Sequence, residues 1–262
     1  MITALREVAV GIGDDAAVLP GGLVLAGDML VEGVHFDRGR SDAFTIGRRA
    51  AAANLSDMAA MGAVPVCMLA AFGVPEGFGD VVALATGIAD HGVPLVGGDL
   101  TRAEQLVVSI AVLGRAERPV LRSGGNPGDL LVVTGRLGGQ AASGYTAEIT
   151  PRIAEGRSLA QVASAMIDLS DGIASDAARL ADESGCGAVV ELALLPRSEG
   201  ATVEQAACGG EDYELLAAID PAATVPANVP VTVVGRLVEG SGLRLVDPDG
   251  VTADLHGWDH FA

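Results

Sequence analysis

Residues 167–180 read IDLSDGIASDAARL and predict a strand that runs directly into a helix. The apolar start is typical of a buried strand, and residues 173–184 are typical of a helix. Asp168 ends the strand, while Ser170 or Asp171 is suited to cap the helix. Part of this pattern is ordinary capping. The same corner, with its free N–H groups, is also suited to hold phosphate and metal.

Five further acidic motifs share one design along the chain. Each places aspartate or glutamate beside glycine or in a short turn, and several follow an apolar run. The motifs are GIGDD at 11–15, AGD at 26–28, NLSD at 54–57, GGD at 97–99 and GGEDYEL at 209–215. Most of them could be plain turns with solvated acids. Carboxylates at strand ends are equally suited to hard cations, which prefer oxygen ligands.

The NLSD motif lies in a helix that we expect to run from Ser41 or Asp42 to about Met61. Asn54 and Asp57 are three residues apart and therefore share a helix face. Their neighbours are small or apolar, so an acid here is costly unless it is paired or coordinated. A functional role is favoured over a stray surface aspartate.

Net charge and composition exclude several classes of partner and chemistry. The formal net charge is −18, which disfavours nucleic acid and anionic membranes as partners. The chain has no lysine, so a P-loop or a protein-kinase lysine is excluded. It also lacks GxSxG and HExxH, which argues against serine-hydrolase and zinc-peptidase chemistry. Polyphosphate chemistry would have to use Mg²⁺, arginine and backbone amides.

Cysteine usage and hydropathy indicate a cytoplasmic protein. No apolar run reaches the ~18 residues of a membrane-spanning helix, and no secretory signal is expected at the N-terminus. Cys67, Cys186 and Cys208 are few and widely spaced. That pattern favours a reducing compartment over a disulfide framework or a zinc site.

Alternating strand-like and helix-like segments predict a mixed α/β (α+β) fold with two domains. Residues 114–128 read GRAERPVLRSGGNPG and are the best candidate for a linker. We therefore expect an N-terminal domain at 1–116 and a C-terminal domain at 117–262.

Two single residues have both plain and functional interpretations. A lone histidine such as His35, in EGVHF, is more often structural than functional. Trp258, in the C-terminal HGWDHFA, could pack the tail down or stack on a heteroaromatic ligand.

The motifs in order resemble those of the thiamine-monophosphate kinases. This family belongs to the superfamily that includes aminoimidazole ribonucleotide synthetase. The resemblance covers nearly the whole chain and is carried by GIGDDAAVL, DMLVEGVHF, NLSDMAAMGA, GGDLTR, RSGGNPGD, IDLSDG and GGEDYEL. GGEDYEL and the DHF near the C-terminus favour these kinases over their superfamily relatives.

The resemblance implies a fold, a reaction and an assembly. It implies a two-domain, aminoimidazole ribonucleotide synthetase-like fold and a homodimer joined through the N-terminal sheet. It also implies transfer of the γ-phosphate of ATP directly to thiamine monophosphate, giving thiamine diphosphate, with several Mg²⁺ ions.

Site residues follow from the resemblance position by position. The metal ligands that it implies are Asp15, Asp28, Asp57, Asp99, Asp168 and Asp171. Gly98, Asp99, Arg122 and Ser170 correspond to ATP contacts. His35, Glu211 and Trp258 correspond to contacts with the thiamine substrate.

Departures from the family pattern keep alternatives open. Ala26 and Gly27 stand where the family commonly has Ser-Thr before Asp28, so two hydroxyl ligands are missing. Segments 144–155 and 197–208 are short against the family. The alternatives are another ATP-dependent synthetase of the superfamily, or a non-catalytic protein that binds nucleotide or metal.

Overall fold

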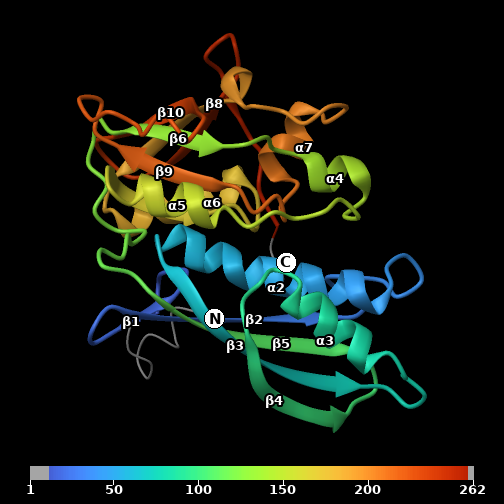
Figure 1. The fold of residues 1–262 in the computed structure, drawn as a ribbon. Helices are drawn as coiled ribbons and strands as arrows, with labels where there is room; N and C mark the ends of the chain where they lie inside the picture. Colours follow the sequence, from blue (N-terminus) through green and yellow to red (C-terminus); the bar gives the residue numbers. More distant parts are fainter. Residues whose placement is uncertain (1–11, 259–262) are drawn as a thin grey trace.

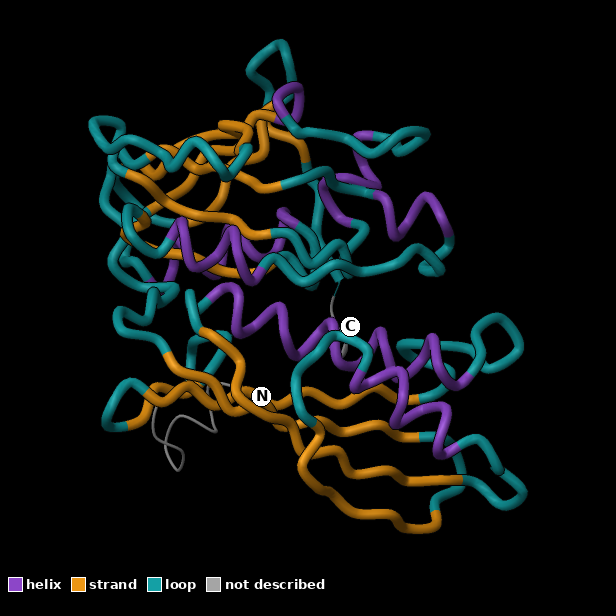
Figure 2. Tube along the Cα trace, viewed as in Figure 1, coloured by secondary structure: helices purple, strands orange, loops and turns teal. Residues whose placement is uncertain are grey.

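Two β-sheets, one in each half of the chain, form separate layers with helices lying between and beside them (Figure 1). The structure is a computed structural model, and it describes residues 12–258. Figure 2 shows the long helix of the N-terminal half between its own sheet and the C-terminal half. The mixed α/β fold predicted from the sequence is confirmed.

Within residues 12–258, the N-terminal sheet has five strands and one covered face. Its order is β1 (Ala17–Leu19), β2 (Leu23–Val31), β5 (Val107–Arg115), β3 (Val64–Val74) and β4 (Leu95–Arg102). Only the β3–β4 pair is parallel. Alternate residues of β5 are buried on the inner face. That face is covered by α2 (Ala43–Ala60) and α3 (Val81–Ala89).

The C-terminal sheet has seven strands and helices on both faces. Its order is β12 (Thr252–Ala253), β11 (Gly242–Val246), β8 (Gly187–Glu191), β10 (Val231–Val238), β6 (Leu130–Thr134), β9 (Leu215–Ile219) and β7 (Ala163–Asp168). One face packs on α6 (Ile173–Glu183). The other packs on α5 (Ile153–Leu159) and the end of α2. The shorter α4 (Gly139–Ser143), η1 (Leu192–Leu194) and α7 (Val203–Cys208) complete the half.

Helix α2 belongs to the cores of both halves. Ile46 and Met58 pack in the core of the N-terminal sheet, while Ala59 and Ala60 pack in the core beneath the second sheet. The run of alanines lets neighbouring backbones approach closely. A Cβ on Gly156 of α5 would lie 2.0 Å from the Ala59 carbonyl oxygen. The small residues of α2 therefore permit the two halves to meet along it.

Most predicted elements are found, with three corrections. Asp42 caps α2 by accepting a hydrogen bond from the Thr45 N–H. Strand β2 runs through the AGD motif, so Asp28 lies within the strand rather than at its end. The GGD motif likewise lies inside β4, not in a turn. Neither Ser170 nor Asp171 caps α6, because the cap position is Gly172.

The first sheet ends at Arg115 and the second begins at Leu130. The predicted boundary between residues 116 and 117 lies in this connection and stays a prediction. Between residues 12 and 258, no helix combines the length and apolarity needed to cross a bilayer.

Helices α2 and α3 cross at a contact that only glycine permits. A Cβ on Gly47 would lie 2.0 Å from the Leu84 carbonyl oxygen, and one on Gly87 would lie 2.0 Å from that of Phe44. Backbone atoms cannot move aside as a flexible side chain can. The crossing therefore depends on both glycines.

We expect Gly87→Ala to lower the free energy of unfolding by about 1–3 kcal/mol, the usual cost of overpacking a core. Gly79→Ala is the matched control, because a Cβ there would meet no heavy atom within 4 Å. Urea unfolding followed by circular dichroism measures both. Equal stability of the two variants would contradict the close crossing.

Candidate active site

A cleft of about 1340 Å³ separates the two halves of the molecule. Its N-terminal wall includes the start of the described chain, part of β2 and one side of α2. Its C-terminal wall includes the end of β7, the loop before α6, the later turns of α6 and the GGEDYEL turn. The motifs quoted from the sequence therefore face one another across this cleft, with the exception of GGD.

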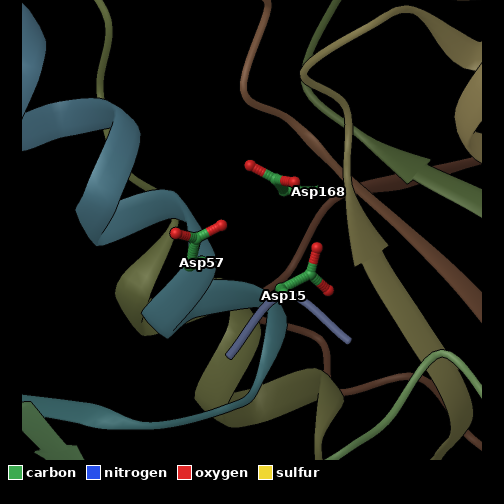
Figure 3. Close-up of side chains that lie close together, drawn as sticks. All are labelled: Asp15, Asp57 and Asp168. Carbon is green, nitrogen blue, oxygen red and sulfur yellow. The ribbon is translucent and has the colours of Figure 1, made fainter. Parts of the chain in front are cut away.

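Three carboxylates from separate segments converge in the cleft (Figure 3). Asp15 precedes β1, Asp57 projects from α2, and Asp168 is the last residue of β7. One oxygen from each lies within 4.8 Å of the others. Two belong to the N-terminal half and one to the C-terminal half, so the cluster exists only when the halves are assembled.

The chemistry of this cluster fits a hard divalent cation. The Asp15 Oδ2 atom is buried and has no hydrogen-bond partner among residues 12–258. Burial, followed by the charges of Asp28, Asp168 and Asp15, raises the pKa of Asp57 well above its usual range. Burial and then Asp15 do the same to the pKa of Asp168. Mg²⁺ prefers oxygen ligands, and three carboxylates this close together are stabilised by a positive charge between them.

Asp28 adds a fourth carboxylate at the open edge of β2. Strand β1 pairs with β2 only as far as Leu25, which leaves the following residues to line the cleft. Asp28 is exposed toward the cleft. Burial raises its pKa, and Asp15 and Asp171 raise it further. The Asp28 N–H donates to Asn54 Oδ1 at 2.9 Å, which gives Asn54 of NLSD a structural role.

Arg122 lies beside this cluster and pairs with Asp15. Its Nη2 is 2.6 Å from Asp15 Oδ1, and its backbone N–H donates to Asp14 Oδ1 at 2.6 Å. Burial lowers the pKa of Arg122, but Asp15, Asp168 and Asp176 together raise it above its usual value. The buried Nε has no hydrogen-bond partner within the described chain. Arg122 also lines the cleft, so its guanidinium is available to an anionic ligand there.

Arg179 binds the acids at the start of α6. Its Nη1 is 2.6 Å from Asp171 Oδ2 and 2.7 Å from Asp176 Oδ1. The fully buried Asp176 also accepts the Asp171 N–H at 3.0 Å. Burial raises the pKa of Asp176 to about 7. This network, rather than a helix cap, orients Asp171 toward the cleft.

The remaining sequence-predicted contacts line the same cleft. They are His35, Ser170, Glu211 and Trp258. His35 Nδ1 accepts the Val31 N–H at 3.1 Å. The Trp258 backbone N–H donates to the Asp171 carbonyl at 3.0 Å, which holds the tail beside the acids. The side chain of Trp258 is more than half exposed.

Gly98 and Asp99 do not line this cleft. Asp99 is paired in register with Ala71 and, with Leu69, lines a shallow depression on the outer face of the sheet. That face is opposite to α2 and α3 (Figure 1). A Cβ on Gly98 would lie 1.7 Å from the Ala70 carbonyl oxygen, so sheet packing alone accounts for this glycine. A single chain does not bring Asp99 to the carboxylate cluster.

Sequence reasoning missed several groups of the cleft, among them Arg49, Arg179 and Tyr213. A signal was present for the two arginines. Arg49 is a charged residue in an alanine-rich helix, as costly to bury as Asp57. Arg179 follows Asp176 by three residues on one helix face. Tyr213 has a φ of 51°, which no local pattern revealed.

Comparison with known proteins finds one family model and relatives that cover nearly the whole chain. Residues 13–116 match the family model described as "AIR synthase related protein, N-terminal domain". The chain is 39% identical to a thiamine-monophosphate kinase of Halobacterium salinarum, over 95% of this chain and 94% of that protein. It is 36% identical to the enzyme of Salmonella typhimurium, over 98% and 93%. The solved structure of AaThiL complexed with AMPPCP and TMP matches with a TM-score of 0.90 at 29% identity, covering 99% of this chain and 95% of that one.

The buried acids make the stability of the metal-free protein depend on pH. Because the pKa values of Asp57 and Asp168 are raised on folding, their protonated forms stabilise the folded state. That stabilisation is complete below about pH 4 and is lost as the pH rises through the raised values. Asp176, with a pKa of about 7, adds to the loss near neutrality.

We expect Asp57→Asn to reduce this loss of stability with rising pH. The substitution should stabilise the metal-free protein at pH 8 by about 1 kcal/mol or more. Urea unfolding from pH 5 to pH 8 in EDTA measures the effect, with the exposed Asp249→Asn as control. Added Mg²⁺ should stabilise the wild type more than Asp57→Asn. If the free energy of unfolding of the variant falls with pH as steeply as that of the wild type, Asp57 is not a source of this pH dependence.

Proposed function

This chain belongs to the thiamine-monophosphate kinase family, and we propose that its cleft carries out that reaction with the residues described above. It is an ATP-dependent kinase that phosphorylates thiamine monophosphate to thiamine diphosphate. The assignment to this family is based on relatives that are 36–39% identical over nearly the whole chain. The complex of AaThiL with AMPPCP and TMP supports the same pair of reactants.

The convergence of Asp15, Asp57 and Asp168 from both halves carries this proposal. ATP is a polyanion and thiamine monophosphate carries a phosphate, while the cleft that receives them is itself acidic. Mg²⁺ bound at these carboxylates would neutralise the phosphates and polarise the γ-phosphoryl group. Asp28 and Asp171 extend the ligand set along the cleft. The Gly27 carbonyl would stand in for the hydroxyl ligands that Ala26 and Gly27 do not supply.

Arg122 and Ser170 form the proposed ATP contacts of the cleft. The guanidinium of Arg122 donates to phosphate with the fork geometry that suits it. Ser170 is adjacent to Asp171 and lines the cleft between the two sets of acids. Both residues hold the nucleotide in place rather than take part in bond making.

His35, Glu211 and Trp258 form the proposed wall for the organic part of thiamine monophosphate. The exposed indole of Trp258 offers a flat surface to a heteroaromatic ring. The attacking group is a phosphate oxygen, which is ionised near neutral pH. No general base is therefore required, and the work of the cleft is alignment and charge neutralisation.

Gly98 and Asp99 keep their proposed ATP and metal roles only through a second copy of the chain. They lie on the outer face of the N-terminal sheet, so a partner must bring that face to its own cleft. A homodimer through this sheet therefore belongs to the proposal. So does a cytoplasmic location, which rests on three unpaired cysteines.

The outer face of the N-terminal sheet has the character of an interface. Its strands expose apolar side chains that no described element covers, among them Leu25, Met29 and Leu69, which are 41%, 56% and 50% exposed. Between them lie small residues of β5, such as Ala111. A contiguous apolar patch of this kind marks an association surface.

We expect the purified chain to form ADP with ATP, Mg²⁺ and thiamine monophosphate, but not with thiamine or aminoimidazole-type ribonucleotides as acceptors. Asp57→Asn should lower turnover about 100-fold, since a metal contributes several kcal/mol to such a transition state. Asp249→Asn is the control. A coupled ADP assay over the acceptor panel, with and without Mg²⁺, gives the answer.

Each alternative predicts its own result in this assay. ATP binding without turnover on any acceptor would favour the non-catalytic protein. Turnover with a different acceptor would favour another synthetase of the superfamily. Near-normal turnover of Asp57→Asn at limiting Mg²⁺ would refute the carboxylate cluster as the metal site.

We expect Leu69→Glu to convert the homodimer to monomers, because it places a charge in the centre of the apolar face. Val82→Glu is the matched control, since Val82 is 79% exposed on α3 and away from that face. Sedimentation velocity at micromolar concentration measures both. A monomeric wild type, or a dimeric Leu69→Glu, would contradict the proposed interface.

A further inference from the structure

Arg49 is a nearly buried cation on the alanine-rich helix α2. Its side chain is only 10% exposed. Burying a guanidinium is unfavourable unless all sides of it find partners. Its neighbour Arg48 differs, because Arg48 pairs with the largely exposed carboxylates of Asp90 and Glu148. A solvated surface arginine needs no partner, but the buried position of Arg49 must be explained by the groups that it binds.

The partners of Arg49 all belong to the opposite half of the molecule. Its Nη2 pairs with Glu211 Oε2 of the GGEDYEL turn. Its Nη1 donates to Gln140 Oε1 on α4 at 3.1 Å and to the Ala147 carbonyl at 3.5 Å. Gln140 in turn donates to the same Ala147 carbonyl at 3.0 Å. One planar, forked donor thus holds three segments, which a lysine could not do.

The turn that Arg49 reaches has an unusual backbone. Glu211 and Tyr213 have φ values of 56° and 51°, in the left-handed region that favours glycine. Non-glycine residues stay in this region only where the surroundings hold them, and such positions concentrate at functional sites. The Glu211 N–H donates to the Ser170 carbonyl at 2.7 Å, and the Tyr213 N–H to that of Leu169 at 2.9 Å.

Those backbone hydrogen bonds hold the turn to the C-terminal half. The ion pair with Arg49 links the Glu211 side chain to the N-terminal half. The ion pair uses Oε2 of Glu211 and leaves Oε1 as the oxygen for a ligand. Glu211 lines the cleft with its side chain 21% exposed. The orientation of this carboxylate is therefore set from α2, across the cleft.

We propose that Arg49 is a positioning residue that holds Glu211 in the orientation that recognises the organic, cationic part of the phosphate acceptor. This inference rests on the proposed function and goes beyond it. Arg49 does not touch the reacting phosphates, so it acts through Glu211. Its loss should weaken recognition of thiamine monophosphate and leave recognition of ATP unchanged.

We expect Arg49→Gln to raise the KM for thiamine monophosphate about 10-fold or more, with little change in the KM for ATP. Arg49→Lys should recover part of the loss, because it keeps the charge but not the fork. The double variant Arg49→Gln with Glu211→Gln should be no worse than Glu211→Gln alone, since residues that act as a unit are non-additive. Steady-state kinetics on the full chain measure these values, and calorimetric titration measures binding of thiamine monophosphate alone. Arg48→Gln is the matched control.

Several outcomes would overturn the inference. They are an Arg49→Gln variant with wild-type KM for thiamine monophosphate, equal rises in the KM values of both substrates, or additive losses in the double variant. If Arg49→Gln fails to fold, a folded Arg49→Lys with wild-type kinetics would overturn it as well. A wild type that neither binds nor phosphorylates thiamine monophosphate would refute the proposed function and this inference with it. An active wild type beside an unaffected Arg49→Gln would refute this inference alone.

Discussion

Mutual repulsion among carboxylates in the cleft is the interaction on which the stability and the proposed metal binding of this molecule depend. Asp15, Asp57 and Asp168 are brought within 4.8 Å by three segments that are distant in the sequence. Burial and repulsion both disfavour the ionised forms of Asp57 and Asp168. Folding energy from the hydrophobic cores must therefore offset a local cost at the cleft. A site that stores such strain is relieved by a cation, so binding and stability are coupled.

Helix α2 makes this arrangement possible because it is shared by both halves. Its small residues pack against the first sheet, α3 and α5, and its polar residues serve the cleft. Asn54 orients the Asp28 backbone, Asp57 joins the carboxylates, and Arg49 reaches the GGEDYEL turn. A bulkier helix could not lie between the halves, and a fully apolar one would leave the cleft without ligands.

The sequence predicted what local chemistry determines. Apolar runs and caps located most strands and helices, and the costly acid of NLSD pointed to the cleft. It could not predict what depends on pairing between distant segments. The short β1 leaves the edge of β2 open at Asp28, and the register of β4 with β3 turns Asp99 to the outer face. Similarly, Gly172 takes the cap position of α6, while the Asp171 side chain pairs with Arg179 and its N–H donates to Asp176.

The absence of lysine has a structural counterpart in how the arginines of the cleft are used. Arg49, Arg122 and Arg179 each pair with a carboxylate, namely Glu211, Asp15 and Asp171. A guanidinium so engaged retains further donors, but its charge is already balanced. The cleft thus has little net positive charge to offer two phosphorylated reactants. Neutralisation must come from cations that arrive with the ligands, and the acids of the cleft are where such cations would be held.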